Sequence, residues 1–205
     1  MFFSFDGIDG TGKTTQMDLC CEWLCELGYE VVACRDPGST PLGERVREIL
    51  LHSDAATPIG RRCEMLLYMA ARAQLVDEVI RPALAAKKIV VSDRYLLANL
   101  VYQGHAGGLD VEAVRRVGLV TIDGTEPNAI FLLDMPPAAA DRRLNRALDR
   151  MERQGGDYRQ RLRDGFLAEA ARANGPIHVI DADRPVEAVQ ADIRQIIQDL
   201  LRNNE

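Results

Sequence analysis

A glycine-rich segment near the start of the chain has the residue types and spacing of a phosphate-binding loop. It reads Gly7-Ile8-Asp9-Gly10-Thr11-Gly12-Lys13-Thr14, followed by Thr15. Glycines let the backbone turn tightly and aim its N–H groups at phosphate oxygens, Lys13 adds a positive charge, and the Thr14 hydroxyl suits Mg²⁺. A short apolar strand before the segment and a helix after it are the context that this chemistry requires. We therefore expect residues 7–15, called the phosphate loop below, to bind the phosphates of a nucleotide.

Two carboxylates and an arginine are candidates to complete such a site. Asp93 and Arg94 directly follow an apolar run at 89–92. There Asp93 can reach the water shell of a metal ion, and the planar guanidinium of Arg94 can bridge donor and acceptor phosphates. Asp9 needs a nearby cation beside phosphates, or it accepts a hydrogen bond from a sugar of a second substrate. An Asx turn at Asp9 and a plain ion pair after the strand remain the structural alternatives.

Residues 140–164 are rich in arginine although the chain as a whole carries a net charge of −6. Four arginines recur at helical spacing, and the helix is expected to break at Gly155-Gly156; they are Arg143, Arg146, Arg150 and Arg153. A mobile arginine-lined flap could close over phosphates and exclude water. The alternative is a solvated helix with surface ion pairs.

A second group of residues could recognise a flat base. Tyr68 and Arg72 lie four positions apart and share a helix face, so a ring could stack on the base while a guanidinium binds its edge. An amphipathic pair at the edge of the core is the alternative. The loop after the second strand and a segment at helical spacing after Tyr95 add further polar and turn-forming residues: Arg35, Pro37, Asn99, Tyr102 and Gln103.

The bulk properties limit the remaining possibilities. A chain of 205 residues with 47% hydrophobic and 27% charged residues fits one globular domain. The acidic balance argues against a nucleic-acid partner, and no run approaches the ~20 apolar residues of a membrane span. An odd count of 5 cysteines without a secretory signal indicates reduced thiols and a cytoplasmic protein.

Short apolar runs alternate with helical patterns along the chain, which predicts a parallel sheet with helices on both faces. Ligands of such folds bind beyond the carboxyl ends of the strands, where the candidate residues lie. The expected strands span 2–5, 30–34, 89–92, 129–134 and 177–181. A long central helix should end near Pro82 and a last helix should start at Pro185. Their expected buried residues are Leu66, Met69, Ala70, Ala73, Val76 and Ile80 in the first, and Val186, Val189, Ile193, Ile196 and Leu200 in the second.

Together these residues resemble the bacterial thymidylate kinases. The resemblance rests on motifs in the family's order over almost the whole chain: the phosphate loop, Arg35–Pro41, Tyr68–Arg72, Asp93–Tyr95, Tyr102–Gly104 and Asp149–Glu152. It implies a doubly wound, five-stranded parallel α/β fold of the P-loop nucleoside monophosphate kinase type. It also implies a single domain over residues 1–205 with a lid at about 143–157, and a homodimer.

The resemblance further implies Mg²⁺-dependent transfer of the γ-phosphoryl group of ATP to dTMP, which yields dTDP and ADP on the route to dTTP. Thr14 and, through water, Asp93 would serve the metal. The phosphate loop would bind ATP, and the catalytic residues would be Lys13, Arg94, Arg150 and Asp9. Because this loop has no arginine, Arg150 would supply one from the lid. The dTMP site would comprise Asp9, Arg35, Pro37, Tyr68, Arg72, Arg94, Asn99, Tyr102 and Gln103.

Three positions depart from the family pattern, since Asp36 replaces a usual Glu, Ser39 a usual Gly, and Tyr68 a usual Phe. Two other functions stay open at this point. One is a kinase for another nucleoside monophosphate. The other is a nucleotide-switched binding module, which would need no pocket for a second substrate.

Overall fold

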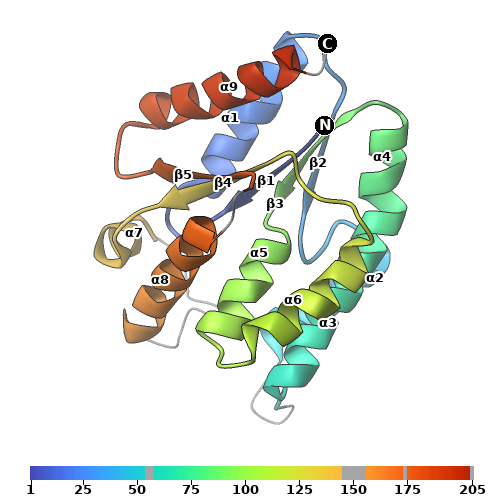
Figure 1. Ribbon diagram of the computed structural model, residues 1–205, viewed down its shortest axis with the longest axis vertical. Helices are drawn as coiled ribbons and strands as arrows, with labels where there is room; N and C mark the ends of the chain where they lie inside the picture. The colour runs from blue at the N-terminus through green and yellow to red at the C-terminus, as the bar shows by residue number, and fades with distance from the viewer. Residues whose placement is uncertain (54–57, 145–155, 173–174, 204–205) are drawn as a thin grey trace.

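The computed structural model describes residues 1–53, 58–144, 156–172 and 175–203. Its centre is one parallel sheet with the strand order β2-β3-β1-β4-β5 (Figure 1). The strands are β1 (Phe2–Asp6), β2 (Val31–Arg35), β3 (Ile89–Asp93), β4 (Ala129–Asp134) and β5 (Ile177–Asp181). The predicted five-stranded doubly wound sheet is confirmed, and the predicted strand ends differ from the observed ones by at most one residue.

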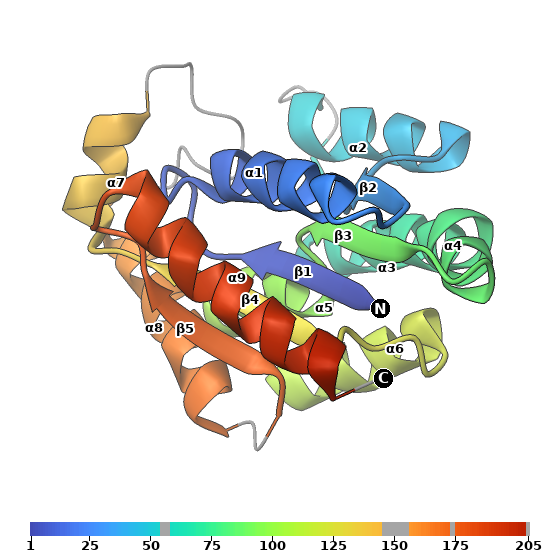
Figure 2. The same cartoon turned by 90° about the horizontal axis from the view of Figure 1, so that it is seen from above.

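Helices cover both faces of this sheet, as Figures 1 and 2 show. On one face α1 (Lys13–Glu26) packs against the strands and against α9 (Val186–Arg202). Helix α2 (Pro41–His52) packs on α3 near the β2 edge. The other elements are α3 (Arg61–Leu75), α4 (Arg81–Ala85), α5 (Leu96–Asn99), α6 (Val111–Ile122), α7 (Pro137–Arg143), α8 (Gly156–Arg172) and the π-helical turns η1 (Val76–Ile80) and η2 (Leu100–His105).

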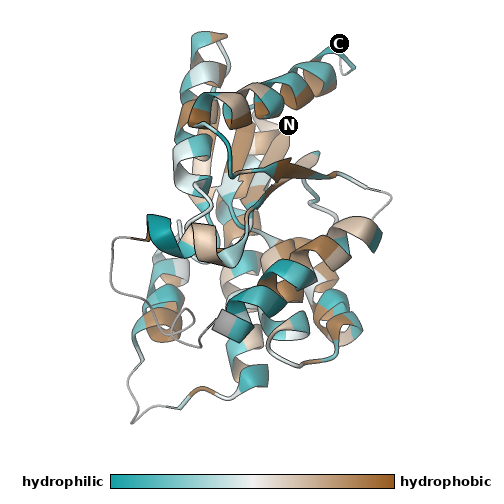
Figure 3. Ribbon diagram, turned by 90° about the vertical axis from the view of Figure 1, so that its left-hand side faces the viewer, coloured by the Kyte–Doolittle hydropathy of each residue, from teal (hydrophilic) through white to brown (hydrophobic). Residues whose placement is uncertain are grey.

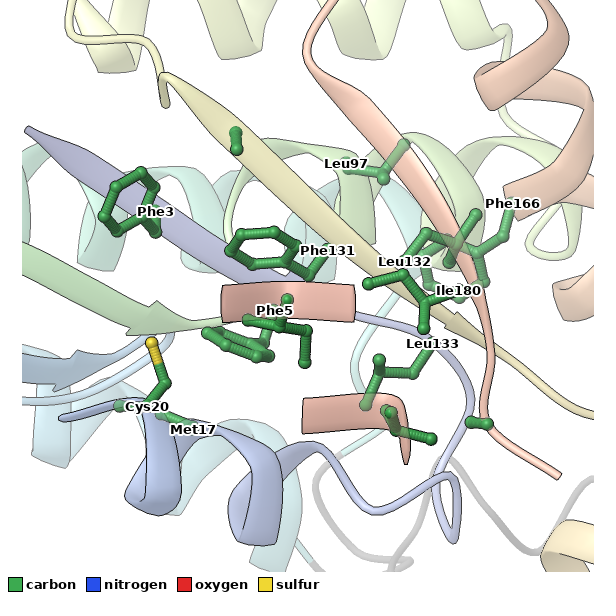
Figure 4. Close-up of a cluster of buried hydrophobic side chains, with 14 of the residues drawn as sticks. Phe3, Phe5, Met17, Cys20, Leu97, Phe131, Leu132, Leu133, Phe166 and Ile180 are labelled. Atoms are coloured by element: carbon green, nitrogen blue, oxygen red, sulfur yellow. The ribbon is translucent and has the colours of Figure 1, made fainter. Parts of the chain in front are cut away.

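The main core lies on both sides of the central strands. The ring of Phe131 on β4 lies 5.1 Å from that of Phe5 on β1, measured between centroids. In Figure 4 Met17 approaches this cluster from α1, while Phe166 and Leu97 belong to elements on the opposite face. The ribbon coloured by hydropathy shows the same division, with apolar strands inside and helices that alternate between polar and apolar residues (Figure 3). Burial on both faces explains why the three central strands, β3, β1 and β4, read as apolar runs.

The central helix differs from its prediction in two ways. It does not end near Pro82, because α3 continues through η1 into α4, where Pro82 occupies one of the first two positions. Pro82 therefore lies inside a continuous helical path, directly after the π-helical turn η1. The expected buried stripe was also partly wrong: Leu66 is 53% exposed and Ala70 is exposed, whereas Glu64 and Arg72 are buried.

Two further expectations need correction. Val186 is 41% exposed rather than buried, because Val189, Ile193 and Ile197 form the inner face of α9. The sequence also predicted a helix that continues from Arg143 through the next arginines. The first residues of that prediction are wrong, because α7 ends at Arg143 and Leu144 is extended. Arg146, Arg150 and Arg153 fall on residues 145–155, outside the described residues, so most of the expected lid at 143–157 stays a prediction.

Candidate active site

The phosphate loop connects β1 to α1, as the sequence predicts. Gly10 and Gly12 have φ angles of 92° and 91°, a region that side chains rarely adopt. A Cβ on Gly10 would lie 2.3 Å from the carbonyl oxygen of Ala140, so this position also has no room for a side chain. The glycine spacing therefore reflects both the turn of the loop and its close approach to α7.

Lys13 is buried at the start of α1 and its ammonium group lies among acceptors of its own loop. Its Nζ donates to the carbonyl oxygens of Gly7 at 3.2 Å and Ile8 at 3.0 Å, and to Asp9 Oδ1 at 3.2 Å. Burial, and then the nearby Arg94, lower the pKa of Lys13. Local acceptors thus hold a desolvated cation at the edge of the site.

Arg94 links the end of β3 to the phosphate loop. Its Nη2 donates to Asp9 Oδ1 at 2.5 Å and its Nη1 donates to the Gly7 carbonyl oxygen at 3.0 Å. The guanidinium also lies over the ring of Tyr102, 5.0 Å from its centroid. Arg94 has a left-handed φ of 68°, a strained backbone of the kind found at functional sites. The structure therefore brings Asp9, Arg94 and Tyr102 together beside the loop.

Two carboxylates at the ends of neighbouring strands lack hydrogen-bond partners among the described residues. They are Asp6, of which both oxygens are buried, and Asp93, of which Oδ1 is buried. Burial raises the pKa of Asp6 to about 7, although Arg94 and Lys13 oppose this shift. Carboxylate and hydroxyl oxygens are ligands that Mg²⁺ prefers, and Thr14 lines the same cavity as Asp93. These residues fit a metal ion that is bound partly through water.

The predicted base-binding residues form a different environment, built from buried side chains. Arg72 is only 1% exposed. Its Nε donates to Asp36 Oδ2 at 2.5 Å, and its Nη2 donates to the carbonyl oxygen of Tyr95 at 3.2 Å. Tyr68, one turn away on α3, is half-buried and lines the same cavity. An ion pair with almost no solvent access therefore fixes the guanidinium, whose carbon lies 5.3 Å from the centroid of the Tyr95 ring.

A chain of polar side chains lies behind this pocket. Gln103 Nε2 donates to Glu64 Oε1 at 3.1 Å, and Asn99 Nδ2 donates to Gln103 Oε1 at 2.7 Å. All three side chains are buried, and Asn99 and Gln103 line the cavity.

One cavity of about 1190 Å³ connects the two environments. The predicted site residues that line it are Asp9, Gly10, Thr11, Gly12, Lys13, Thr14, Thr15, Arg35, Pro37, Tyr68, Arg72, Asp93, Arg94, Asn99, Tyr102 and Gln103. Gly7 and Ile8 contribute carbonyl oxygens to Lys13 behind the wall, and Arg35 is exposed at the rim, where it pairs with Glu44 at 2.7 Å. Arg150 lies outside the described residues, and its assignment stays a prediction.

Several residues at the site carried no clear signal in the sequence. Arg159 on α8 donates to the carbonyl oxygen of Asp9 at 2.6 Å and pairs with Asp141 at 2.7 Å. It belongs to the arginine-rich segment, but only the packing of α8 distinguishes it from its neighbours. Glu64 matches no motif, and the motif that contains Asp36 does not show that this residue pairs with Arg72. Arg184, which follows β5, also lines the cavity on the side of the phosphate loop.

A family model described as thymidylate kinase matches residues 5–193 of the chain. The chain belongs to the thymidylate kinase family. A thymidylate kinase of Bifidobacterium longum subsp. infantis is 43% identical over 206 residues, covering 100% of this chain and 88% of the relative. One from Symbiobacterium thermophilum is 41% identical over 202 residues, covering 98% of this chain and 94% of that protein. The family resemblance seen in the motifs is therefore confirmed.

The solved structures agree with this family assignment. The crystal structure of thymidylate kinase from Ehrlichia chaffeensis matches with a TM-score of 0.79 at 31% identity. The match covers 97% of this chain and 98% of that chain. The P-loop nucleoside monophosphate kinase fold predicted for the chain is thereby confirmed.

Proposed function

We propose that this thymidylate kinase family member transfers the γ-phosphoryl group of ATP to dTMP and releases dTDP and ADP, a step towards dTTP. One observation carries the proposal. A single cavity holds a phosphate loop at one end and a buried base-recognition pocket at the other, with Arg94 between them. Such a cavity places two nucleotides with their phosphates facing each other.

The chemistry that we propose is a direct in-line transfer without a covalent intermediate. The phosphate of dTMP is already nucleophilic, so positioning and charge neutralisation supply most of the catalysis. Lys13 and the loop N–H groups would bind the β- and γ-phosphates of ATP. Arg94 would bind the acceptor phosphate, and Asp9 would keep Arg94 in place through the 2.5 Å contact. Arg150 would add a further positive charge from the lid.

At the other end of the cavity, Tyr68 would stack on the thymine and Arg72 would donate to its edge. Asn99 and Gln103 would provide the remaining polar contacts with the base. Tyr102, which packs against Arg94, would lie near the deoxyribose and disfavour a 2′-hydroxyl. Arg35 and Pro37 would complete the acceptor side.

Thr14 and Asp93 are the residues that would hold Mg²⁺, the latter through water. The ion would neutralise charge on the phosphates of ATP. We expect EDTA to abolish turnover and added Mg²⁺ to restore it. Asp93→Asn should raise the Mg²⁺ concentration needed for half-maximal rate, which a titration of rate against Mg²⁺ would measure.

A panel of acceptors tests the substrate assignment. ADP release is followed in a coupled assay with dTMP, dCMP, UMP and AMP as acceptors. We expect dTMP to give the highest kcat/KM. A higher value for any other monophosphate would contradict the assignment, and ATP turnover that needs no acceptor would favour a nucleotide switch. The family match supports a kinase that acts on dTMP, and it favours neither a kinase for another monophosphate nor a nucleotide switch.

We also propose that the protein is a homodimer that uses α3 and α6. These helices pack side by side (Figure 1), and both expose large apolar residues, among them Leu66 at 53% and Val120 at 78%. Light scattering should give twice the monomer mass, and Val120→Glu should shift the measured mass towards that of one monomer.

No described helix is long and apolar enough to cross a membrane. The cytoplasmic location and the lack of a nucleic-acid partner stay predictions.

A further inference from the structure

The buried polar chain formed by Glu64, Gln103 and Asn99 has a direction. An ionised carboxylate can only accept hydrogen bonds, so the Gln103 atom that faces Glu64 must be the donor, Nε2. Gln103 then presents Oε1 to Asn99, which must answer with Nδ2. Each amide alone could be turned either way, and only the carboxylate at the end of the chain fixes both.

The fixed direction determines what Asn99 offers to the cavity. Its remaining atom, Oδ1, is a buried acceptor without a hydrogen-bond partner among the described residues. The side chain is 2% exposed and lines the same cavity as Tyr68 and Arg72. Leaving a buried acceptor unpaired costs about 1–3 kcal/mol. A ligand with a donor at this position therefore removes a cost, whereas a ligand with an acceptor there keeps it.

Pyrimidine bases differ in the required way. Thymine carries N3–H, a donor, between two carbonyl oxygens, whereas neutral cytosine has an unprotonated N3, an acceptor, next to an amino group. An acceptor at Asn99 beside a donor at Arg72 complements the first edge and opposes the second.

We propose that Glu64 is a positioning residue for base specificity, which acts through Gln103 and sets the orientation of the Asn99 amide. The assignment rests on the proposed function, since it concerns the acceptor pocket for dTMP. If Asn99 turned over to suit cytosine, Gln103 would have to turn as well. Its Oε1 would then face the Glu64 carboxylate, acceptor against acceptor. Glu64 thereby opposes the inverted orientation of the two amides, although it is not among the described residues that line the cavity and reaches the cavity through Gln103.

The variant Glu64→Gln tests this directly, because it keeps the shape and adds a donor. A glutamine at 64 can pair with Gln103 in either orientation, so the chain can invert. The acceptors are dTMP and 5-methyl-dCMP, which differ only at the edge that faces Arg72 and Asn99. We expect wild type to favour dTMP strongly in kcat/KM. In Glu64→Gln we expect this preference to fall at least about tenfold, mainly through better use of 5-methyl-dCMP.

Two further variants separate polarity from packing. Glu64→Asp keeps an acceptor-only group, so it should keep the preference even if it lowers the melting temperature more than Glu64→Gln does. Gln103→Met breaks the chain at its middle and should lower the preference while Glu64 is intact. A role in packing alone would make Glu64→Asp the more damaging change for both readouts.

The outcomes distinguish this assignment from the proposed function. If wild type phosphorylates dTMP, and folded Glu64→Gln and Gln103→Met both keep a preference within twofold of wild type, the role of Glu64 is overturned alone. If wild type does not phosphorylate dTMP, the proposed function fails and the assignment fails with it. A lower preference in both variants, with the preference kept in Glu64→Asp, supports it.

Discussion

The two ends of the active-site cavity are built in different ways. The phosphate end is a continuous stretch, residues 7–15, whose shape depends on glycine backbone angles and whose Lys13 ammonium bonds to acceptors of the loop itself. The base end collects side chains from the loop after β2, from α3, and from the helical segment that follows β3. The phosphate end is therefore a local conformation, and the base end is a product of tertiary packing.

This difference has an energetic consequence. Phosphates of any nucleotide would satisfy the first end, so we expect it to provide binding and catalysis without base selectivity. The second end contains a buried ion pair and buried amides, whose partners must all be present. We therefore expect substitutions in the loop to damage mainly turnover, and substitutions around the base to damage stability and specificity together.

The largest effect should come from Lys13→Ala. We expect kcat to fall by about 10³-fold or more, because the variant lacks a charge on the transferred phosphoryl group. Stability should change little, since Asp9 keeps its contact with Arg94 and a cation that burial disfavours has been removed. Steady-state kinetics and a thermal melt measure the two effects. A large fall in melting temperature with turnover preserved would reverse the contrast between the two ends.

At the base end, Arg72→Ala should show the opposite pattern, with a large loss of stability. It leaves Asp36 buried without its cation, which typically costs 3–5 kcal/mol of unfolding free energy. The KM for dTMP should rise as well, because a donor to the base is lost. Urea denaturation and kinetics measure both effects.

A double substitution sharpens this prediction. Asp36→Leu with Arg72→Met replaces the ion pair by apolar groups, and should recover most of the stability but not the KM. If Arg72→Ala alone proves as stable as wild type, the ion pair is not the element that holds this end together.

Asp6 lies below the phosphate loop and should make stability depend on pH. Its folded pKa of about 7 is above the usual value of 3.8, so between these values the folded protein holds more protons than the unfolded chain. The unfolding free energy should therefore fall as the pH rises from about 4 to about 7, by up to about 1.4 kcal/mol per pH unit. Below that window Asp6 is protonated in both states and contributes nothing.

The matched variant is Asp6→Asn, which cannot ionise. Its stability relative to wild type should increase between pH 5 and pH 7.5, as measured by urea denaturation at both values. Wild type and Asp6→Asn could instead differ in unfolding free energy by the same amount at both pH values. That result would show that Asp6 does not titrate in this window.

The smallest effect should come from Tyr68→Phe. Stacking on a base depends on the ring, which this change keeps, so we expect the KM for dTMP to change less than about threefold. Tyr68→Ala removes the ring and should cost about 1–3 kcal/mol of binding, as lost base stacking does elsewhere. Equal effects of the two variants would assign the role to the hydroxyl instead of the ring.

The sequence alone predicted the phosphate end and the order of the elements. Gly10 and Lys13 could be assigned because their roles depend on neighbours a few residues away. The central strands were readable because burial on both faces leaves unbroken apolar runs. The family resemblance then located Arg72 and Asn99, although the buried face of the central helix that carries Arg72 was predicted partly wrongly. That error arose because a buried ion pair takes a place that periodicity assigns to apolar residues.

Only the tertiary structure determined which partners these side chains have. Asp36 meets Arg72 from 36 positions away, and Glu64 meets Gln103 from 39 positions away. Nothing in the local pattern marks Glu64, because a glutamate in the first turn of a helix is ordinary surface chemistry until the fold buries it. The sequence by itself therefore predicted phosphate binding at the loop, since that chemistry depends on neighbouring residues. By our proposal, base specificity depends on the direction of a buried hydrogen-bond chain, which exists only after α3 and η2 have packed together.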